Sequence, residues 1–226
     1  MRLKLATGIL LLGGAASLSA ETLADLSARM DLAAASFRGM TSKLKRISYT
    51  AVIKDTSEDA GSIAMKVSGK SDMHVRVDFA TPDEKTWAFR GRKAELYIPK
   101  INTVQEYDLG KHGRLIDQFL LLGFGTKSRE LAKSYHMKHV GVEQLDGAAA
   151  SKLELVPKSE EALKHLKRVE IWFPAGGGSP VRQKFYLGSG DYMLVMYWGM
   201  KLEANLPDSA VRLALPANVK REFPGR

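Results

Sequence analysis

Residues 75–100 alternate apolar and polar side chains in three short runs. A period of two places successive side chains on opposite faces of a β-strand, so each run predicts a strand with one apolar face. Pro82, Asp83 and Gly91 separate the runs and favour tight turns. The segment therefore predicts an antiparallel meander with one apolar and one polar face. The apolar positions are Val75, Val77, Phe79, Trp87, Phe89, Leu96 and Ile98.

The same period of two recurs on both sides of this meander. Upstream, residues 44–55 and 63–67 alternate in the same way, with the polar segment 55–61 expected as the turn between them. Short links between the runs favour antiparallel hairpins over parallel crossovers. In all we expect about eleven strands. The others are expected over residues 102–108, 136–145, 151–157, 167–174, 181–187 and 192–203, with 211–215 as a candidate last strand.

Four segments have a helical pattern instead. Residues 21–40 carry an apolar stripe at a period of 3.6, which is typical of a helix that packs on a core. Residues 114–124 are apolar almost all round, and such a helix is normally buried. Shorter helices are expected at residues 127–135 and 159–165. We therefore expect an α+β protein, in which the first helix and the apolar insert cover the apolar face of one large antiparallel sheet.

The first residues have the layout of a secretory signal peptide. Arg2 and Lys4 precede an apolar run over residues 5–12, and small residues follow as far as Ala20. The apolar run is too short to span a bilayer comfortably, which argues against an uncleaved anchor. We expect cleavage near Ala20 and export to the periplasm, with residues 21–226 forming a single domain.

Composition limits the chemistry that the chain can perform. It has no cysteine, which excludes a disulfide framework, a thiolate nucleophile and a zinc–thiolate site. Its formal net charge of +9 suits anionic partners, although ordinary solubility explains it equally well. Export argues against nucleic acid as that partner. Arg90, Arg92 and Lys93 gather at one expected hairpin, either as a solvated turn or as a docking patch for an acidic partner.

The patterns of known active sites are not matched. His136 and His139 lie three apart on an expected strand, so they would point to opposite faces and make a poor metal pair. The glycines at 176–178 lack the Lys-Ser/Thr of a phosphate-binding loop and fit a hairpin turn. Ser189 is also explained by a hairpin turn. We therefore expect no catalysis, no cofactor and no metal.

The quoted residues resemble a known family. Val75-Arg76-Val77-Asp78-Phe79, Pro82-Asp83-Glu84, Gly91-Arg92-Lys93 and Leu96-Tyr97-Ile98-Pro99 follow an N-terminal helix in an exported chain. Together with the apolar insert and the second run of strands, they resemble the LolA-like periplasmic lipoprotein carriers. Gly91, Tyr97 and Pro99 match the family pattern, while Arg90 replaces its turn Asp. Val67-Ser68 stands where the best-known carriers have an arginine before a proline.

This resemblance implies a fold, a function and partners. The fold would be an incomplete β-barrel whose helices close its concave apolar side. The protein, a monomer, would bind the acyl chains of a lipoprotein, or of another lipid, and carry them toward the outer membrane. The implied partners are an inner-membrane ABC-type release complex and an outer-membrane acceptor. The alternative function is a lipid-sensing or lipoprotein-sensing module of an envelope-stress regulator.

The expected binding surface is the apolar side of the first strands, and the expected lid is the apolar insert. Lid and lipid would compete for one surface, so that displacing the lid weakens net binding. The cavity is expected to be lined by Tyr49, Ala51, Ile53, Ile63, Met65, Val75, Val77, Phe79, Trp87, Phe89, Leu96 and Ile98. The lid is expected to consist of Leu115, Phe119, Leu120, Leu121, Leu122 and Phe124.

Overall fold

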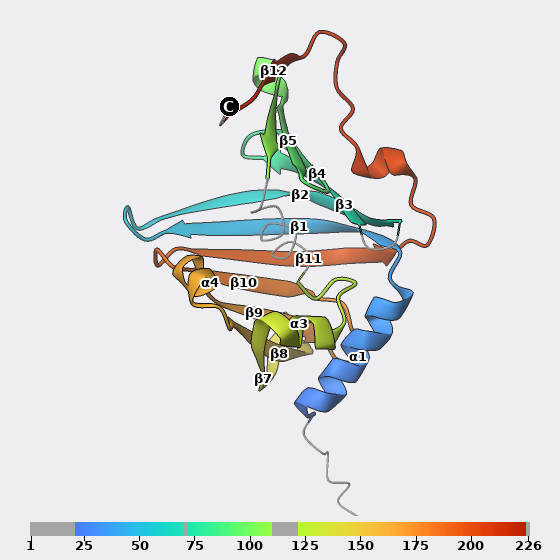
Figure 1. Ribbon diagram of the computed structural model, residues 1–226, viewed down its shortest axis with the longest axis vertical. Coiled ribbons are helices and arrows are strands. Elements are labelled where there is room, and N and C mark those ends of the chain that lie inside the picture. The colour runs from blue at the N-terminus through green and yellow to red at the C-terminus, as the bar shows by residue number, and fades with distance from the viewer. Residues whose placement is uncertain (1–20, 70–71, 110–121, 225–226) are drawn as a thin grey trace, which may run out of the picture.

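The computed structural model describes residues 21–69, 72–109 and 122–224. Its strands form one twelve-stranded sheet in the order β12-β6-β5-β4-β3-β2-β1-β11-β10-β9-β8-β7 (Figure 1). The order begins at β12 and ends at β7, so the sheet is open across the described residues. The strands are β1 (Gly39–Thr50), β2 (Asp55–Ser68), β3 (Asp72–Thr81), β4 (Lys85–Arg90), β5 (Lys93–Ile98), β6 (Thr103–Asp108), β7 (Tyr135–Leu145), β8 (Ala148–Pro157), β9 (Leu166–Pro174), β10 (Arg182–Leu187), β11 (Tyr192–Leu202) and β12 (Lys220–Glu222).

Two meanders make up this sheet and meet at β1 and β11. Strands β1 to β6 are neighbours in chain order, after which the chain moves to the far edge and returns through β7 to β11. β11 then pairs with β1, with Leu44 opposite Tyr197. Every pair is antiparallel except β12 with β6, which is parallel. The expected large antiparallel sheet is confirmed.

The C-terminal part of the expected strand list needs a correction. Residues 211–215 do not form a strand: Val211 ends a 3-10 turn, η3 (Asp208–Val211), and the residues after it are irregular. The last strand is β12, whose three residues pair with β6. A strand of this length is too short to show a recognisable alternation in the sequence.

Helix α1 (Leu23–Ser36) begins at a capping box. The Thr22 hydroxyl accepts a hydrogen bond from the Asp25 amide at 3.2 Å, and the Thr22 amide donates to the Asp25 carboxylate at 2.9 Å. Leu26 and Met30 point from the helix into the core and are fully buried. The helix ends before Phe37, whose backbone is extended, and is therefore shorter than the expected segment.

Helix α1 packs against the glycine-rich segment that follows β9. Arg29 of the helix donates hydrogen bonds to the carbonyl oxygens of Pro174, at 3.0 Å, and of Gly177. A side chain on Gly178 would come within 2.3 Å of the Arg29 carbonyl oxygen. Glycine at this position therefore lets the turn lie directly against the helix, a packing role that the hairpin pattern alone did not indicate.

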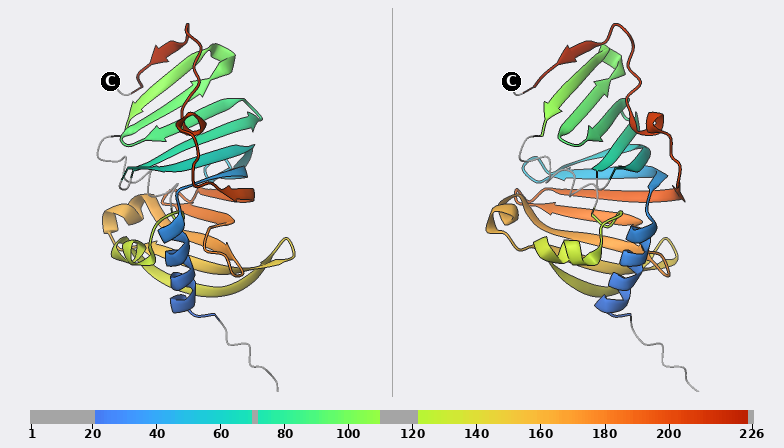
Figure 2. Two further views of the ribbon diagram at one scale, coloured as in Figure 1. Left: turned by 90° about the vertical axis from the view of Figure 1, so that its right-hand side faces the viewer. Right: turned by 45° about the vertical axis from the view of Figure 1, so that its right-hand side comes forward.

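Two more helices lie against the second meander (Figure 2). Helix α3 (Ser128–Ser134) is tied to α1 by Asp31, whose carboxylate accepts hydrogen bonds from the Ser128 amide at 2.6 Å and hydroxyl at 3.0 Å. Helix α4 (Glu160–His165) contacts β8 and β9, and η1 (Pro99–Ile101) is a 3-10 turn between β5 and β6. Both short helices expected from the sequence are confirmed. None of the described helices is long and apolar enough to cross a lipid bilayer.

One core joins the two meanders on the inner face of the sheet, which we define as the face against which α1 packs. It contains apolar side chains from α1, from both meanders and from Leu122 and Phe124. These two residues are the described end of the expected apolar insert, and they are almost fully buried. Residues 114–121 of the insert lie outside the described residues.

The C-terminal segment covers part of the opposite, outer face. It packs on β2 and β3 through η3, where Val211 is fully buried. Lys66 pairs with Asp208 at 2.5 Å, and the guanidinium of Arg76 donates to the Arg212 carbonyl oxygen at 3.2 Å. The described C-terminal segment therefore does not cover the inner face of the first meander.

Gly61→Ala tests the close approach of β2 to β3. The pairing shifts between Ala60 and Gly61, and a side chain on Gly61 would lie 1.8 Å from the Asp78 carbonyl oxygen. Because backbone must move to relieve this clash, we expect the free energy of unfolding to fall by about 2–3 kcal/mol in urea titrations. The neighbouring change Ser62→Ala is the control and should cost less than about 0.5 kcal/mol. Equal effects of the two changes would contradict this packing.

Candidate functional site

An apolar pocket of about 590 Å³ lies on the inner face of the first meander. Strands β1 to β6 form one wall, and β11 forms the other. Helices α1 and α3 lie over the second meander instead, so neither of them packs on this part of the face (Figures 1 and 2). The lining residues are Leu44, Arg46, Ile63, Val77, Phe79, Lys85, Trp87, Phe89, Ala94, Leu96, Tyr107, Leu109, Met193, Val195 and Tyr197.

Direct cross-strand pairing brings the central lining residues together. Ile63 lies opposite Val77, Val77 opposite Trp87, and Trp87 opposite Leu96. These four side chains form a row across β2, β3, β4 and β5, since directly paired residues point to the same side of a sheet. We call them the central row.

Aromatic rings form the side of the pocket toward β6. The Trp87 ring stacks on Phe89 with centroids 5.7 Å apart and packs at a tilt on Tyr107 with centroids 5.8 Å apart. Phe89 is opposite Ala94, which in turn is opposite Tyr107. The small Ala94 side chain between the two rings leaves space in the pocket, whereas a larger residue there would fill it.

Half of the expected cavity residues line this pocket. Met65 and Val75 are on the same face, but they belong to the buried core that includes Phe37 and Phe124. Ile98 ends β5 opposite Thr103 and is not part of the lining. The expected residues that do line the pocket are Ile63, Val77, Phe79, Trp87, Phe89 and Leu96.

The expected inward positions at the end of the first strand need a correction. Tyr49 lies opposite Tyr192, and their rings stack with centroids 5.1 Å apart. These residues alternate with Ser48 and Met193, and Met193 lines the pocket, so Tyr49 faces the outer side. Leu44 and Arg46 occupy the inward positions of β1 instead.

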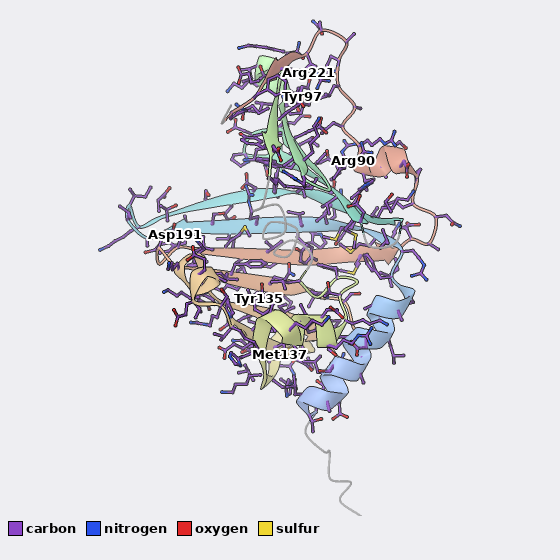
Figure 3. The ribbon with its side chains drawn as sticks, in the orientation of Figure 1. Arg90, Tyr97, Tyr135, Met137, Asp191 and Arg221 are labelled. Atoms are coloured by element: carbon purple, nitrogen blue, oxygen red, sulfur yellow. The ribbon has the colours of Figure 1, made fainter. Side chains whose placement is uncertain are left out.

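Ala51 and Ile53 also lie elsewhere, because the chain turns earlier than expected. They belong to the turn 51–54, and Ile53 is exposed. The Ala51 amide donates a hydrogen bond at 2.7 Å to the carboxylate of Asp191, which lies at this end of the sheet (Figure 3). The polar segment expected as the turn, 55–61, is part of β2 and pairs with β1. Its side chains are polar because most of them are exposed at the end of a long hairpin.

The β11 wall was not predicted. Met193, Val195 and Tyr197 alternate along β11 and point inward, but the sequence around them is apolar on both faces and gives no direction. Their place opposite β1 depends on a pairing between strands about 150 residues apart, as for Leu44 and Tyr197. The sequence indicated a strand over these residues but did not indicate which strand pairs with it.

A cluster of three charges closes one end of the pocket. Asp59 accepts hydrogen bonds from Arg46, through Nε at 3.1 Å and Nη2 at 2.6 Å, and from Lys85 Nζ at 2.7 Å. The Arg46 guanidinium lies 4.5 Å and the Lys85 ammonium 5.4 Å from the centre of the Phe79 ring. Burial raises the pKa of Asp59, but the hydrogen bonds and positive charges of Lys85 and Arg46 together lower it by more. The pKa of Asp59 is therefore below its usual value.

A buried polar contact anchors the segment that follows residue 121. Gln183 donates a hydrogen bond to the Leu122 carbonyl oxygen and accepts one at 2.8 Å from the hydroxyl of Tyr197. The Phe124 ring packs edge-on against Tyr197 with centroids 5.3 Å apart. Burial raises the pKa of Tyr197, so its hydroxyl stays protonated and donates. Tyr197 thereby connects the pocket wall to this segment.

Of the expected lid, only this end can be placed. Leu122 and Phe124 are core residues and are not part of the pocket lining. Leu115, Phe119, Leu120 and Leu121 lie outside the described residues.

Two members of the expected basic docking patch have carboxylate partners. Arg92 lies 3.5 Å from Asp108, and Lys93 lies 2.9 Å from Glu106. A hydrogen bond from Lys93, partly opposed by burial and helped by Arg221, lowers the pKa of Glu106. Arg90 and Arg221 both lie in the half of the molecule formed by β4, β5, β6 and β12 (Figure 3). The patch is therefore a mixed-charge surface rather than a purely basic one.

Comparison with known proteins finds similarity in structure. No family model and no curated protein matches the sequence. An uncharacterized conserved protein from Thermus thermophilus matches with a TM-score of 0.54 at 12% identity, over 88% of this chain and 98% of that one. MucB matches with a TM-score of 0.52 at 14% identity, over 87% of this chain and 64% of the MucB chain. At these identities the likeness concerns the fold.

The expected fold class, a large, curved and open antiparallel sheet with few helices, is confirmed. A LolA superfamily protein from Nitrosomonas europaea aligns over 86% of this chain and 99% of that one, at 17% identity and a TM-score of 0.37. As expected for a LolA-like fold, the sheet is large, curved and open, with helices on its inner face. The pocket is the part of that inner face that the described helices do not cover.

Gln183→Leu tests the buried contact of the Gln183 amide with Leu122 and Tyr197. The change leaves the Leu122 carbonyl and the Tyr197 hydroxyl buried without their partner. We therefore expect the free energy of unfolding to fall by about 2–4 kcal/mol in urea titrations. Adding Tyr197→Phe should recover part of that loss, since one unpaired polar group is removed. If the double variant is less stable than Gln183→Leu alone, the contact between Gln183 and Tyr197 is contradicted.

Asp59→Asn tests the charge cluster through its pH dependence. Since the folded-state pKa of Asp59 is lowered, its contribution is fully present above the unfolded pKa of ~3.9 and is lost as the pH falls through the folded pKa. The variant should lose about 1–3 kcal/mol of unfolding free energy at pH 7 and should show a flatter decline below about pH 5. Asp208→Asn, which breaks an exposed pair, is the control and should change the stability little. Parallel pH profiles for parent and Asp59→Asn would contradict the assignment.

Proposed function

We propose that the protein is a carrier that holds acyl chains of a lipoprotein, or of another lipid, in the apolar pocket. The observation that supports this most directly is the pocket itself. It is continuous with the buried core, with which it shares Ile63, Val77 and Phe79, and it extends that apolar surface to the half-buried Trp87, Phe89 and Leu96. Its volume of about 590 Å³ is within the range of roughly 300–1,000 Å³ that small-molecule sites occupy.

The energetics suit reversible carriage. Each buried methylene contributes ~0.8 kcal/mol, so a chain of about ten buried methylenes contributes roughly 8 kcal/mol before the costs of association. Because the costs of association reduce the net affinity for the lipid, an acceptor that also binds the acyl chain is able to remove it from the pocket. A carrier needs only binding and release, and we accordingly propose no catalytic step.

The proposed setting is the periplasm. The signal-peptide pattern of residues 1–20 supports export, and the LolA-like fold is consistent with traffic toward the outer membrane. By resemblance, an inner-membrane ABC-type complex would deliver the cargo and an outer-membrane acceptor would receive it. We propose that the carrier acts as a monomer.

A second candidate is a sensing module with a protein partner. It is favoured by the shared fold with MucB, which has been crystallised in complex with MucA. This chain spans 64% of the MucB chain, so a partner-binding role would have to be supplied by the shared part. A sensor with an empty pocket in the cell would carry no stoichiometric lipid when it is purified.

Lipid extraction from the native protein tests the carrier proposal. We expect mass spectrometry of an organic extract, from protein purified out of the periplasm, to show acyl lipid in roughly stoichiometric amount. Leu96→Gln places an amide in the central row and should weaken binding of a fluorescent fatty acyl probe about tenfold. Glu95→Gln, the neighbour on the other face of β5, is the matched control and should bind as the parent does. A lipid-free extract together with equal probe affinity for both variants would overturn the proposal.

A further inference from the structure

The cluster at the end of the pocket is asymmetric in its exposure to the pocket. Arg46 and Lys85 line the pocket, whereas Asp59, which pairs opposite Arg46 on the same face of the sheet, is buried and is not among the lining residues. Their side chains are 27% and 26% exposed, compared with 6% for Asp59. A molecule in the pocket would therefore meet two positive groups first.

The cluster also carries a net charge of +1, from two cations and one carboxylate. None of the described residues that line the pocket is an aspartate or a glutamate. The remaining lining is apolar apart from the hydroxyls of Tyr107 and Tyr197. A net positive charge beside low-dielectric walls attracts an anion more strongly than the same charge on an open surface.

Hydrogen-bonding capacity is left over on both cations. A guanidinium has five N–H groups and an ammonium three. Arg46 directs two of its groups to Asp59 and Lys85 directs one, and no other hydrogen bond from either occurs among the described residues. Three donors of Arg46 and two of Lys85 thus have no partner in the part of the chain that the structure describes, and a ligand can use them.

Both cations are held in place before any ligand arrives. Asp59 fixes both through its hydrogen bonds, and the Phe79 ring lies beneath both of them. The shift in pairing at Gly61, which lies opposite Phe79, brings β2 and β3 close enough for this arrangement. Less conformational entropy is lost when a ligand binds groups that are already ordered.

The position of the cluster fits one end of an amphiphile. Along β3, Phe79 follows Val77 on the same face, and Lys85 lies opposite Phe79 on β4. Lys85 is therefore one inward position beyond the central row, and Arg46 and Asp59, which pair with each other, are two positions beyond it, toward the β1–β2 turn. An acyl chain over the central row would place its head group at the cations.

We propose that this pocket selects amphiphiles with an anionic head group, a phosphate or a carboxylate, over neutral ones. The inference rests on the proposed carrier function and specifies its cargo. An anionic head group offsets the net charge of the cluster and uses its free donors through charge-assisted hydrogen bonds. A neutral head group desolvates the same cations without that return, so its acyl chain binds more weakly.

Binding of single-chain lipids of equal length tests the proposal. Palmitoyl lysophosphatidic acid and palmitate supply the two anionic head groups, and monopalmitoylglycerol supplies a neutral one. The lipids are titrated below their critical micelle concentrations, with the change in intrinsic tryptophan fluorescence, to which the pocket residue Trp87 contributes, as one readout and isothermal calorimetry as the other. We expect the parent to bind the anionic lipids at least about tenfold more tightly than the neutral one.

Lys85→Met provides the variant that separates recognition from folding. It removes one cation but leaves the Arg46–Asp59 pair, and it should reduce the anionic-to-neutral affinity ratio about tenfold. Lys66→Met is the matched control, because Lys66 is also ion-paired and 25% exposed but lies on the outer face. It should leave the ratio as in the parent.

Each contrary result has a distinct meaning. Equal affinities of the parent for anionic and neutral lipids would overturn the head-group inference and leave the carrier function standing. An equal loss for both lipid classes in Lys85→Met would show that the cluster is structural and would also overturn the inference. Inorganic phosphate binding as tightly as lysophosphatidic acid would overturn the requirement for an acyl chain. If none of the lipids binds, the carrier function itself fails.

Discussion

The structure depends on how the apolar inner face of a twelve-stranded sheet is kept from water. Helices α1 and α3 and the residues that follow Leu122 cover the part over the second meander. The part over the first meander carries the same kind of apolar row but has no described helix against it, and there the pocket opens. Because apolar surface in water is unfavourable in proportion to its area, a site of this kind favours a ligand that covers it.

The pairing of β1 with β11 is what makes that surface continuous. It places Tyr197 at the boundary, where one side faces the pocket and the hydroxyl holds Gln183, which in turn holds Leu122. A polar chain of this kind is stable only when each buried member is paired. Tyr197 therefore belongs both to the wall that a ligand would contact and to the packing that keeps the second meander covered.

Local pattern accounts for much of the site and fails in a specific place. The alternation in residues 75–100 correctly indicated the faces of Val77, Trp87 and Leu96, because the pleat of a strand is a local property. It failed near Tyr49, where the polar segment 55–61 was interpreted as a turn although it continues a long hairpin. There the exposure of the hairpin end, rather than the backbone conformation, determines which residues are polar.

The sequence by itself determined the strands of each meander, the faces of most residues in the segment 75–100 and the existence of the first helix. Only the tertiary structure decided that Arg46, Asp59 and Lys85 meet, that β11 faces the first meander and that Met65 is core rather than pocket. The reason is the range of the interactions. Side-chain alternation and capping act over a few residues, whereas strand pairing and cover of an apolar face depend on packing between segments far apart in the chain.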